Sequence, residues 1–154
     1  MSHEALDPQT LAETVATAMW SRDHAAHALD MHLDSVAPGS ARLSMTVRGD
    51  MLNGHATCHG GMLFTLADTA FAYACNSDNH NTVASAAYID FLAPSRLGDR
   101  LQAHAQARTP GSGRTGVYDI TVHNLTSGRD VALFRGKSHR VQGLVTESLV
   151  AEAS

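Results

Sequence analysis

Residues 53–76 decide the fold, and they read NGHATCHGGMLFTLADTAFAYACN. The first part of this stretch is polar and contains glycine, which predicts a loop. The part from Met62 to Cys75 has no glycine or proline and is rich in alanine and leucine, which favour a helix. We therefore expect a loop that ends at Gly60 and Gly61, followed directly by a helix.

The predicted helix carries one acid, Asp68, on a mostly apolar face. The positions three, four and seven residues away share that face, and the opposite face is no more polar. A helix that is apolar nearly all round is buried, so Asp68 is expected to be a carboxylate inside a core helix. An unpaired carboxylate there is costly, and it is either used in function or paired with a group such as the Thr65 hydroxyl.

The Gly60-Gly61 pair lies where this helix would start. At such a helix start the free N–H groups and the positive end of the helix dipole are not shielded by a side chain. This arrangement can stabilise a developing oxyanion. A donor for a polarised carbonyl and an acid that attacks or activates water are the two parts that acyl transfer requires. The alternative is a glycine pair that only lets the loop turn into the helix.

The run His59-Gly60-Gly61, with Asp68 in Leu-Ala-Asp-Thr-Ala-Phe-Ala-Tyr-Ala-Cys-Asn-Ser, resembles the acyl-CoA thioesterases of the hotdog fold. Within that family it is most similar to the PaaI group of phenylacetate degradation, which hydrolyses phenylacetyl-CoA or ring-hydroxylated phenylacetyl-CoA. Weaker matches extend the resemblance from about Thr46 to Arg140. It implies an α+β hotdog fold, an antiparallel β-sheet wrapped around a long central helix. It also implies homodimers with active sites at the subunit interface, paired into homotetramers.

The resemblance assigns roles to four residues. Asp68 is the nucleophile or general base, and we favour activation of water although both routes need the same carboxylate. The Gly60 amide polarises the thioester carbonyl, and Asn53 helps to hold the carbonyl or the loop. His59 shapes the loop or contacts the thioester. No metal or other cofactor is implied, and the loop histidines lack a second ligand pair at zinc-like spacing.

Three further residues are candidate contacts to the substrate. Gly61 continues the helix start, and Lys137 and Arg135 could receive the phosphates of coenzyme A, which need cationic donors. Solvent-facing charges on a strand are the alternative for both cations. Ser85 lies near the position where some relatives hold the water, but one residue of register would turn it away.

The rest of the chain predicts one domain over residues 1–154, with a core of about 24–142. Asp7-Pro8 predicts the start of a helix that runs to about Arg22. Alternating apolar and polar residues predict a hairpin of residues 29–34 and 41–48 around Pro38-Gly39. The apolar stretch 82–92 is typical of a central strand, and further strands are expected at 101–108, 117–123 and 131–141. The segment after Gln142 reads as a loosely held tail.

Composition limits the kinds of partner that this protein is expected to bind. A net charge of −4 argues against nucleic acid and offers no membrane patch, and no apolar run approaches the roughly 20 residues that span a bilayer. Acids at Glu4 and Asp7 and the absence of a basic-then-apolar start argue against export. Cys58 and Cys75 agree with a reducing compartment, with a disulfide between them as the alternative. We therefore expect a cytoplasmic enzyme.

Two other functions fit the same residues. A hotdog-fold dehydratase or hydratase acting on acyl thioesters would pair a loop histidine, here His59, with the helix acid Asp68. A non-catalytic acyl-CoA-binding protein would keep the fold without using Asp68. The His-Gly-Gly start of the helix favours hydrolysis over both.

Overall fold

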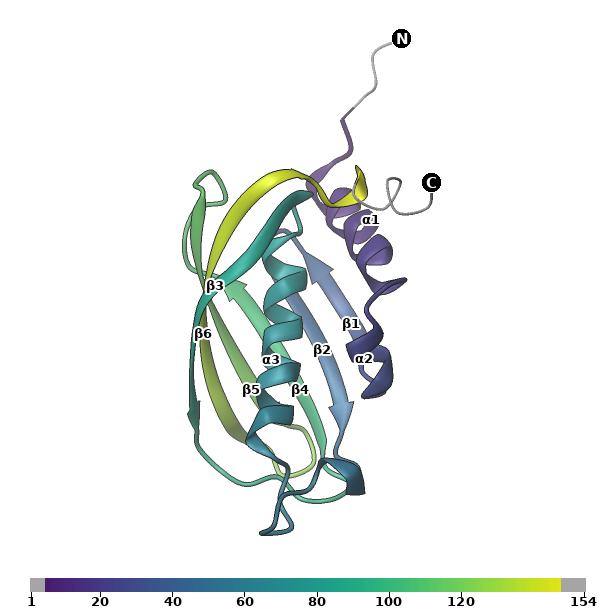
Figure 1. Ribbon diagram of the computed structural model, residues 1–154, viewed down its shortest axis with the longest axis vertical. Coiled ribbons are helices and arrows are strands. Elements are labelled where there is room, and N and C mark those ends of the chain that lie inside the picture. Colours follow the sequence, from purple (N-terminus) through teal and green to yellow (C-terminus); the bar gives the residue numbers. More distant parts are fainter. Residues whose placement is uncertain (1–4, 148–154) are drawn as a thin grey trace.

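The computed structural model describes residues 5–147. The chain contains two N-terminal helices, a β-hairpin, a short 3-10 turn, one long helix and four further strands (Figure 1). In chain order these elements are α1 (Pro8–Trp20), α2 (His24–Ala28), β1 (His32–Ala37), β2 (Ser40–Thr46), η1 (Gly49–Met51), α3 (Gly60–Cys75), β3 (His80–Phe91), β4 (Arg100–Ala107), β5 (Thr115–Asn124) and β6 (Arg129–Leu144).

All strands belong to one six-stranded antiparallel sheet, in the order β1-β2-β4-β5-β6-β3. The long helix α3 lies across one face of this sheet, and α1 and α2 lie beside its β1 edge (Figure 1). Most contacts of α3 are with the middle strands β2, β4 and β5. The predicted α+β architecture, an antiparallel sheet wrapped around a long central helix, is confirmed.

Small residues let α3 lie close to the sheet. Gly136 of β6 faces Phe71, and a Cβ at Gly136 would lie 2.7 Å from the Phe71 ring. Removing a buried aromatic ring such as that of Phe71 costs about 3–5 kcal/mol, because a cavity remains. The buried, sheet-facing side chains of α3 are Leu63, Leu66, Ala67, Ala70, Phe71, Tyr73, Ala74 and Cys75.

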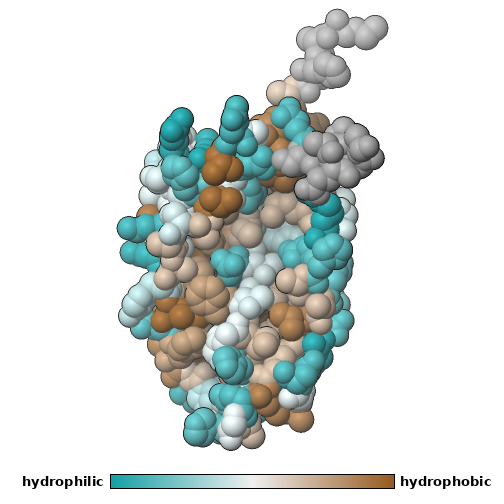
Figure 2. Space-filling model, viewed as in Figure 1, coloured by the Kyte–Doolittle hydropathy of each residue, from teal (hydrophilic) through white to brown (hydrophobic). Residues whose placement is uncertain are grey.

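The other face of α3 is not buried by this chain, so the prediction of a helix buried on every side is wrong for one subunit. Gly61 is exposed, and Thr65, Asp68 and Ala72 are only half-buried. Figure 2 shows the uncovered surface over α3, where apolar and weakly polar residues fill the middle and hydrophilic residues lie mostly at the margins. A single sheet can cover only one side of a helix, which is the reason for the difference.

The apolar stretch predicted as a central strand forms β3, and that placement is wrong. β3 pairs only with β6 and is an edge of the sheet. Its side chains are unusually open, with Tyr88 66% and Phe91 56% exposed. Local composition favours a strand but does not determine which strands lie beside it. Here β6 pairs with both β5 and β3, which leaves β3 at the edge of the sheet.

The N-terminal helix starts where the Asp-Pro pair predicts. The Asp7 carboxylate accepts hydrogen bonds from the N–H groups of Gln9 and Thr10, at 3.1 and 3.2 Å. These bonds satisfy two of the N–H groups that are otherwise unpaired at a helix start. Within residues 5–147 no helix is both long enough and apolar enough to cross a bilayer.

A second short helix, α2, lies between α1 and the first strand, where the sequence predicted no element. Asp23 caps α2 by accepting from the Ala26 N–H at 3.1 Å, and it also accepts from the Tyr73 hydroxyl at 3.0 Å. Leu29 is the C-cap of α2, and Asp30 takes the left-handed conformation with φ 51°. The strand therefore begins at His32, three residues later than the alternation from Leu29 predicts.

The C-terminal segment is held further than predicted. β6 continues to Leu144, and the Val145 N–H donates to the Asn79 carbonyl at 2.9 Å. The Thr146 N–H donates to the Asn79 side chain at 3.1 Å. The prediction of a loose tail after Gln142 is wrong as far as Thr146, and its remainder, residues 148–154, lies outside the described residues.

Candidate active site

The site begins at the N-terminus of α3. His59 is the N-cap, and its Nδ1 accepts from the Gly61 N–H at 2.9 Å. The Gly60 N–H has no hydrogen-bond acceptor among the described residues. The first N–H groups of a helix are unpaired unless capped, and here the cap satisfies Gly61 and leaves Gly60 open. Of the two predicted glycines, Gly60 is therefore the one that presents a free donor.

A pocket of about 390 Å³ opens beside this donor. Phe91 forms its wall and packs against Gly60 so closely that a Cβ at Gly60 would lie 2.9 Å from the Phe91 Cζ. The pocket combines polar groups at the helix start with an apolar wall from the end of β3. Its lining is Asn53, Thr57, Cys58, Gly60, Leu63, Phe91, Leu92, Ala93 and Pro94.

Asn53 shapes the loop before the helix. Its Oδ1 accepts from the N–H groups of His55 and Thr57, at 2.9 and 3.2 Å, and from the Thr57 hydroxyl at 3.2 Å. The Nδ2 of Asn53 has no acceptor within residues 5–147. An Asn side chain offers one acceptor oxygen and one donor nitrogen, so only the donor remains for a ligand.

His59 is engaged as a structural cap. Because Nδ1 accepts from the Gly61 N–H, a neutral ring carries its proton on Nε2. The His59 backbone N–H donates to the Met51 carbonyl at 2.8 Å, which ties the helix start to η1. These contacts favour the predicted loop-shaping role over that of a free base.

Asp68 lies two turns further along α3. No group in the described part of the chain donates a hydrogen bond to its carboxylate, and burial raises the pKa of that carboxyl. Eight residues separate it from Gly60, which corresponds to about 12 Å along the helix axis. The alternative of a carboxylate capped by Thr65 is wrong, because the Thr65 hydroxyl donates to the Gly61 carbonyl at 2.8 Å.

The two candidate cations lie on the opposite face of the sheet from α3. Phe134 contacts the rings of Phe64 and Phe71, so it faces α3, and alternation along β6 turns Arg135 and Lys137 outward. Arg135 makes two hydrogen bonds to Asp119, at 2.7 and 2.9 Å. That guanidinium holds the pKa of Asp119 below its ordinary value, with Arg108 contributing less.

The side chain of Lys137 is exposed, and its ammonium has no hydrogen-bond or ion-pair partner in the described structure. It lines a depression of about 310 Å³ together with Ser85. Ser85 sits at a β-bulge between Ala84 and Ala86, and its hydroxyl donates to the Lys137 carbonyl at 3.2 Å. The bulge is the register change that sequence alone did not resolve, and it directs Ser85 to Lys137.

Both cysteines are free and buried, so the alternative of a disulfide between them is wrong. Burial raises the pKa of Cys58 to about 11 and that of Cys75 to about 12. Cys58 therefore lines the pocket as a neutral thiol. Among the described residues no three His, Cys, Asp or Glu side chains come together as metal ligands.

Phe91 is a pocket residue that sequence reasoning missed. The aromatic residues of α3 belong to the core, because Phe64 and Phe71 pack on Phe134 and Tyr73 is 2% exposed. Phe91 comes from the end of an edge strand and reaches the site only because β3 ends beside the α3 N-terminus. No spacing in the sequence signals that contact.

Comparisons with known proteins identify the family and the fold. The model of the thioesterase superfamily matches residues 55–130. The chain is 55% identical over 131 residues to the acyl-coenzyme A thioesterase PaaI of Escherichia coli, covering 85% of this chain and 92% of that protein. The solved structure of E. coli PaaI, from the phenylacetic acid degradation operon, superimposes with a TM-score of 0.86 at 52% identity, covering 90% of this chain and 99% of that chain.

A more distant structure matches as well. A Streptococcus mutans protein bound to acetyl CoA superimposes with a TM-score of 0.69 at 25% identity, covering 74% of this chain and 90% of that chain. Sequence and fold thus agree over most of the chain. The protein belongs to the thioesterase superfamily and has its hotdog fold.

Proposed function

We propose that this protein hydrolyses acyl-CoA thioesters to a carboxylic acid and free coenzyme A, and that phenylacetyl-CoA or a ring-hydroxylated relative is its substrate in phenylacetate degradation. The observation that carries the proposal is the open Gly60 N–H at the start of α3, in a residue that lines a pocket together with Phe91. A hydrogen-bond donor fixed in this way stabilises the oxyanion of a tetrahedral intermediate.

The catalytic groups come from two subunits. Gly60 and Asp68 of one chain are separated by about 12 Å along α3, whereas the Gly60 N–H must contact the carbonyl oxygen and Asp68 a water beside the carbonyl carbon, each within about 3 Å. Asp68 of one subunit therefore acts with the Gly60 loop of the other.

The edge strand β3 supports this association. Its free edge offers unpaired N–H and C=O groups, and its exposed Tyr88 and Phe91 lose contact with water when a second copy covers them. Asp68 lies on the uncovered face of α3, where the second copy that covers β3 can also contact it. We propose a homodimer with two sites at its interface, paired into a homotetramer.

Asp68 acts as the general base. No residue from 5 to 147 of its own chain donates to its carboxylate, and its raised pKa makes it a stronger proton acceptor than an exposed aspartate. It removes a proton from water as the water oxygen bonds to the carbonyl carbon, and the C–S bond then breaks to release the thiolate. The Gly60 N–H and Asn53 Nδ2 hold the oxyanion, and His59 maintains the loop. These groups supply polarisation and proton transfer, so the reaction needs no metal or other cofactor.

An aromatic acyl group suits the apolar wall of the pocket. Phe91 presents a largely exposed ring there, and Leu63 and Leu92 complete an apolar surface. Aromatic rings in contact gain about 0.5–1.5 kcal/mol beyond their buried area. The names of the E. coli relative and its operon point to the same class of substrate.

Coenzyme A requires cationic contacts for its phosphates. We assign this role to Lys137, whose ammonium is free, in preference to Arg135, whose guanidinium is taken by Asp119. Gly61 has no side chain, and its N–H already donates to His59, so we assign it no charged contact with coenzyme A. The two reduced, buried cysteines suit a cytoplasmic enzyme.

The proposal is tested by measuring free thiol released from phenylacetyl-CoA and from a straight-chain acyl-CoA of similar size. The wild type is expected to hydrolyse phenylacetyl-CoA faster. Asp68→Asn, which keeps the shape of the side chain, is expected to lose a factor of about a hundred or more in kcat. No thiol from either substrate, or an enoyl product instead, would overturn the assignment.

A further inference from the structure

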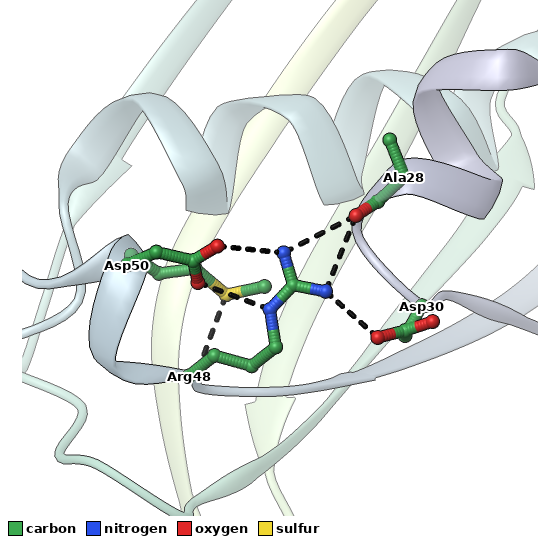
Figure 3. A network of polar contacts seen from close by, with 5 residues as sticks. Ala28, Asp30, Arg48 and Asp50 are labelled. Carbon is green, nitrogen blue, oxygen red and sulfur yellow. Dashed lines mark hydrogen bonds and ion pairs between the residues drawn. The ribbon is translucent and has the colours of Figure 1, made fainter.

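The side chain of Arg48 is fully engaged, although it lies outside the pocket. Its Nε and Nη2 donate to the two carboxylate oxygens of Asp50, each at 3.0 Å (Figure 3). Nη1 donates to Asp30 at 2.7 Å, and Nη1 and Nη2 both donate to the Ala28 carbonyl at 3.2 Å. A guanidinium has five N–H donors, so every one of them has an acceptor.

These acceptors belong to two segments far apart in the chain. Ala28 ends α2, and Asp30 forms the left-handed corner between α2 and β1. Asp50 lies inside η1, the turn that directly precedes the loop of Asn53. An exposed ion pair adds little stability, but the planar, bidentate contact of an arginine fixes geometry. Arg48 thus locks η1 onto the α2–β1 corner.

Contacts with η1 hold the start of α3. The Met51 carbonyl accepts the His59 N–H at 2.8 Å, and Leu52 and Cys58 form a bridge beside it. Met51 is 1% exposed, so its position in the core is fixed by packing. His59 caps the helix, and the next peptide group carries the Gly60 N–H. A continuous chain of contacts therefore connects the guanidinium of Arg48 to the open donor.

We propose that Arg48 is a positioning residue for catalysis, which fixes η1 so that the His59 cap and the Gly60 N–H keep the orientation needed to bind the oxyanion. This role depends on the hydrolase activity proposed above. A displacement of about 1 Å at a reacting group can cost about a hundredfold in rate. Because the oxyanion exists only beyond the ground state, the loss falls on kcat and leaves KM nearly unchanged.

The test compares Arg48→Met and Arg48→Lys with a matched control, Arg108→Met. Arg108 also pairs with an aspartate, Asp119, at 3.0 Å, but it lies far from η1 in the fold. Thiol release from phenylacetyl-CoA is measured well below the melting temperature of each variant, over a range of pH. Amide hydrogen exchange at His59 gives a readout independent of turnover. Asp50→Asn is measured as well, because it weakens the same contact without removing Arg48.

Arg48→Met is expected to lower kcat by about tenfold or more with KM within about twofold, and Arg48→Lys to restore part of the loss. The pH at which activity falls stays where it is in the wild type, because Asp68 sets it. Exchange at the His59 amide becomes faster, whereas Arg108→Met changes neither kcat nor this exchange.

Unchanged kcat in folded Arg48→Met, or a rise in KM alone, would overturn the role of Arg48 while the wild type remains active. If Arg48→Met does not fold, Arg48→Lys and Asp50→Asn decide by the same criteria. An inactive wild type would instead refute the proposed function, and faster exchange at His59 in the variants would still establish the structural connection.

Discussion

The ring of Phe91, at the end of β3, packs against Gly60, the first residue of α3, so closely that a Cβ there would lie 2.9 Å from the ring and would require the ring to shift. The contact joins the exposed edge strand to the one open N–H at the helix start that the described residues present. It explains why a glycine stands there even though its φ is not in the left-handed region.

Gly60→Ala is expected to displace the Phe91 ring and to lower kcat/KM for phenylacetyl-CoA by about tenfold or more, with little change in Tm, since alanine suits a helix. In the double variant Gly60→Ala with Phe91→Ala the collision is absent, so the two losses are not additive. Kinetics of the four proteins in this double-mutant cycle check the prediction. Strict additivity would show that the contact has no part in the site.

Asp68→Asn is expected to stabilise the protein while it abolishes most activity. Burial raises the pKa of Asp68 in the folded chain, so the folded state binds a proton more tightly than the unfolded chain. The ionised carboxylate therefore costs stability above that raised pKa, and the cost disappears as the pH falls to about 3. Thermal melts should show a higher Tm for Asp68→Asn at pH 7 and equal Tm values near pH 3. A lower Tm at pH 7 would mean that the carboxylate has a partner in the assembled protein.

The activity of the wild type should rise with pH, whereas the stability cost of the ionised Asp68 carboxylate also rises with pH. The general base must be ionised, so kcat/KM falls as the pH is lowered through the raised pKa of Asp68. A pH profile of thiol release, with Tm recorded at each pH, separates this loss from unfolding. A profile that stays flat well below the ordinary range for an aspartate would contradict the assignment of Asp68 as base.

Two inactive variants are expected to restore activity when their subunits are mixed. Gly60→Pro removes the N–H, and the preceding His59 already has the extended conformation, φ −60° and ψ 135°, that a following proline requires. In a mixed dimer with Asp68→Asn, one of the two sites combines an intact Asp68 with an intact Gly60 loop.

Random pairing of the two chains should then return about a quarter of wild-type activity, because half of the dimers are mixed and each has one intact site. The chains are unfolded and refolded together, and each variant refolded alone is the control. Absence of recovery in a mixture with proven subunit exchange would place both groups of each site in one chain.

Lys137→Met is expected to raise KM for phenylacetyl-CoA by about three- to tenfold, since one charge-assisted contact to a phosphate is lost. Arg135→Met should change KM by no more than about twofold, because Asp119 already occupies its guanidinium. Its effect on stability should be small, because the ion pair is exposed to solvent. Initial rates over a range of substrate and salt concentrations distinguish the two. Equal effects would show that Arg135 leaves Asp119 to bind the substrate.

Local pattern was sufficient for most of the elements and for the central helix. The cap at Asp7, the glycine pair at the start of α3 and the acid two turns later depend on neighbours within one or two turns, so they can be read along the chain. The helix α2 was not predicted, because its five residues, His24–Ala28, are too few to show a helical period.

The sequence by itself thus determined the helix around Asp68, the glycine pair at its start and the family to which both belong. Only the tertiary structure decided that β3 is an edge, that Phe91 covers Gly60 and that Asp119 occupies Arg135. It also decided which face of α3 remains uncovered, and it connected Arg48 through η1 to His59. The physical reason is that these contacts depend on strand order and register, which are set by pairing between distant segments and leave no local period in the sequence.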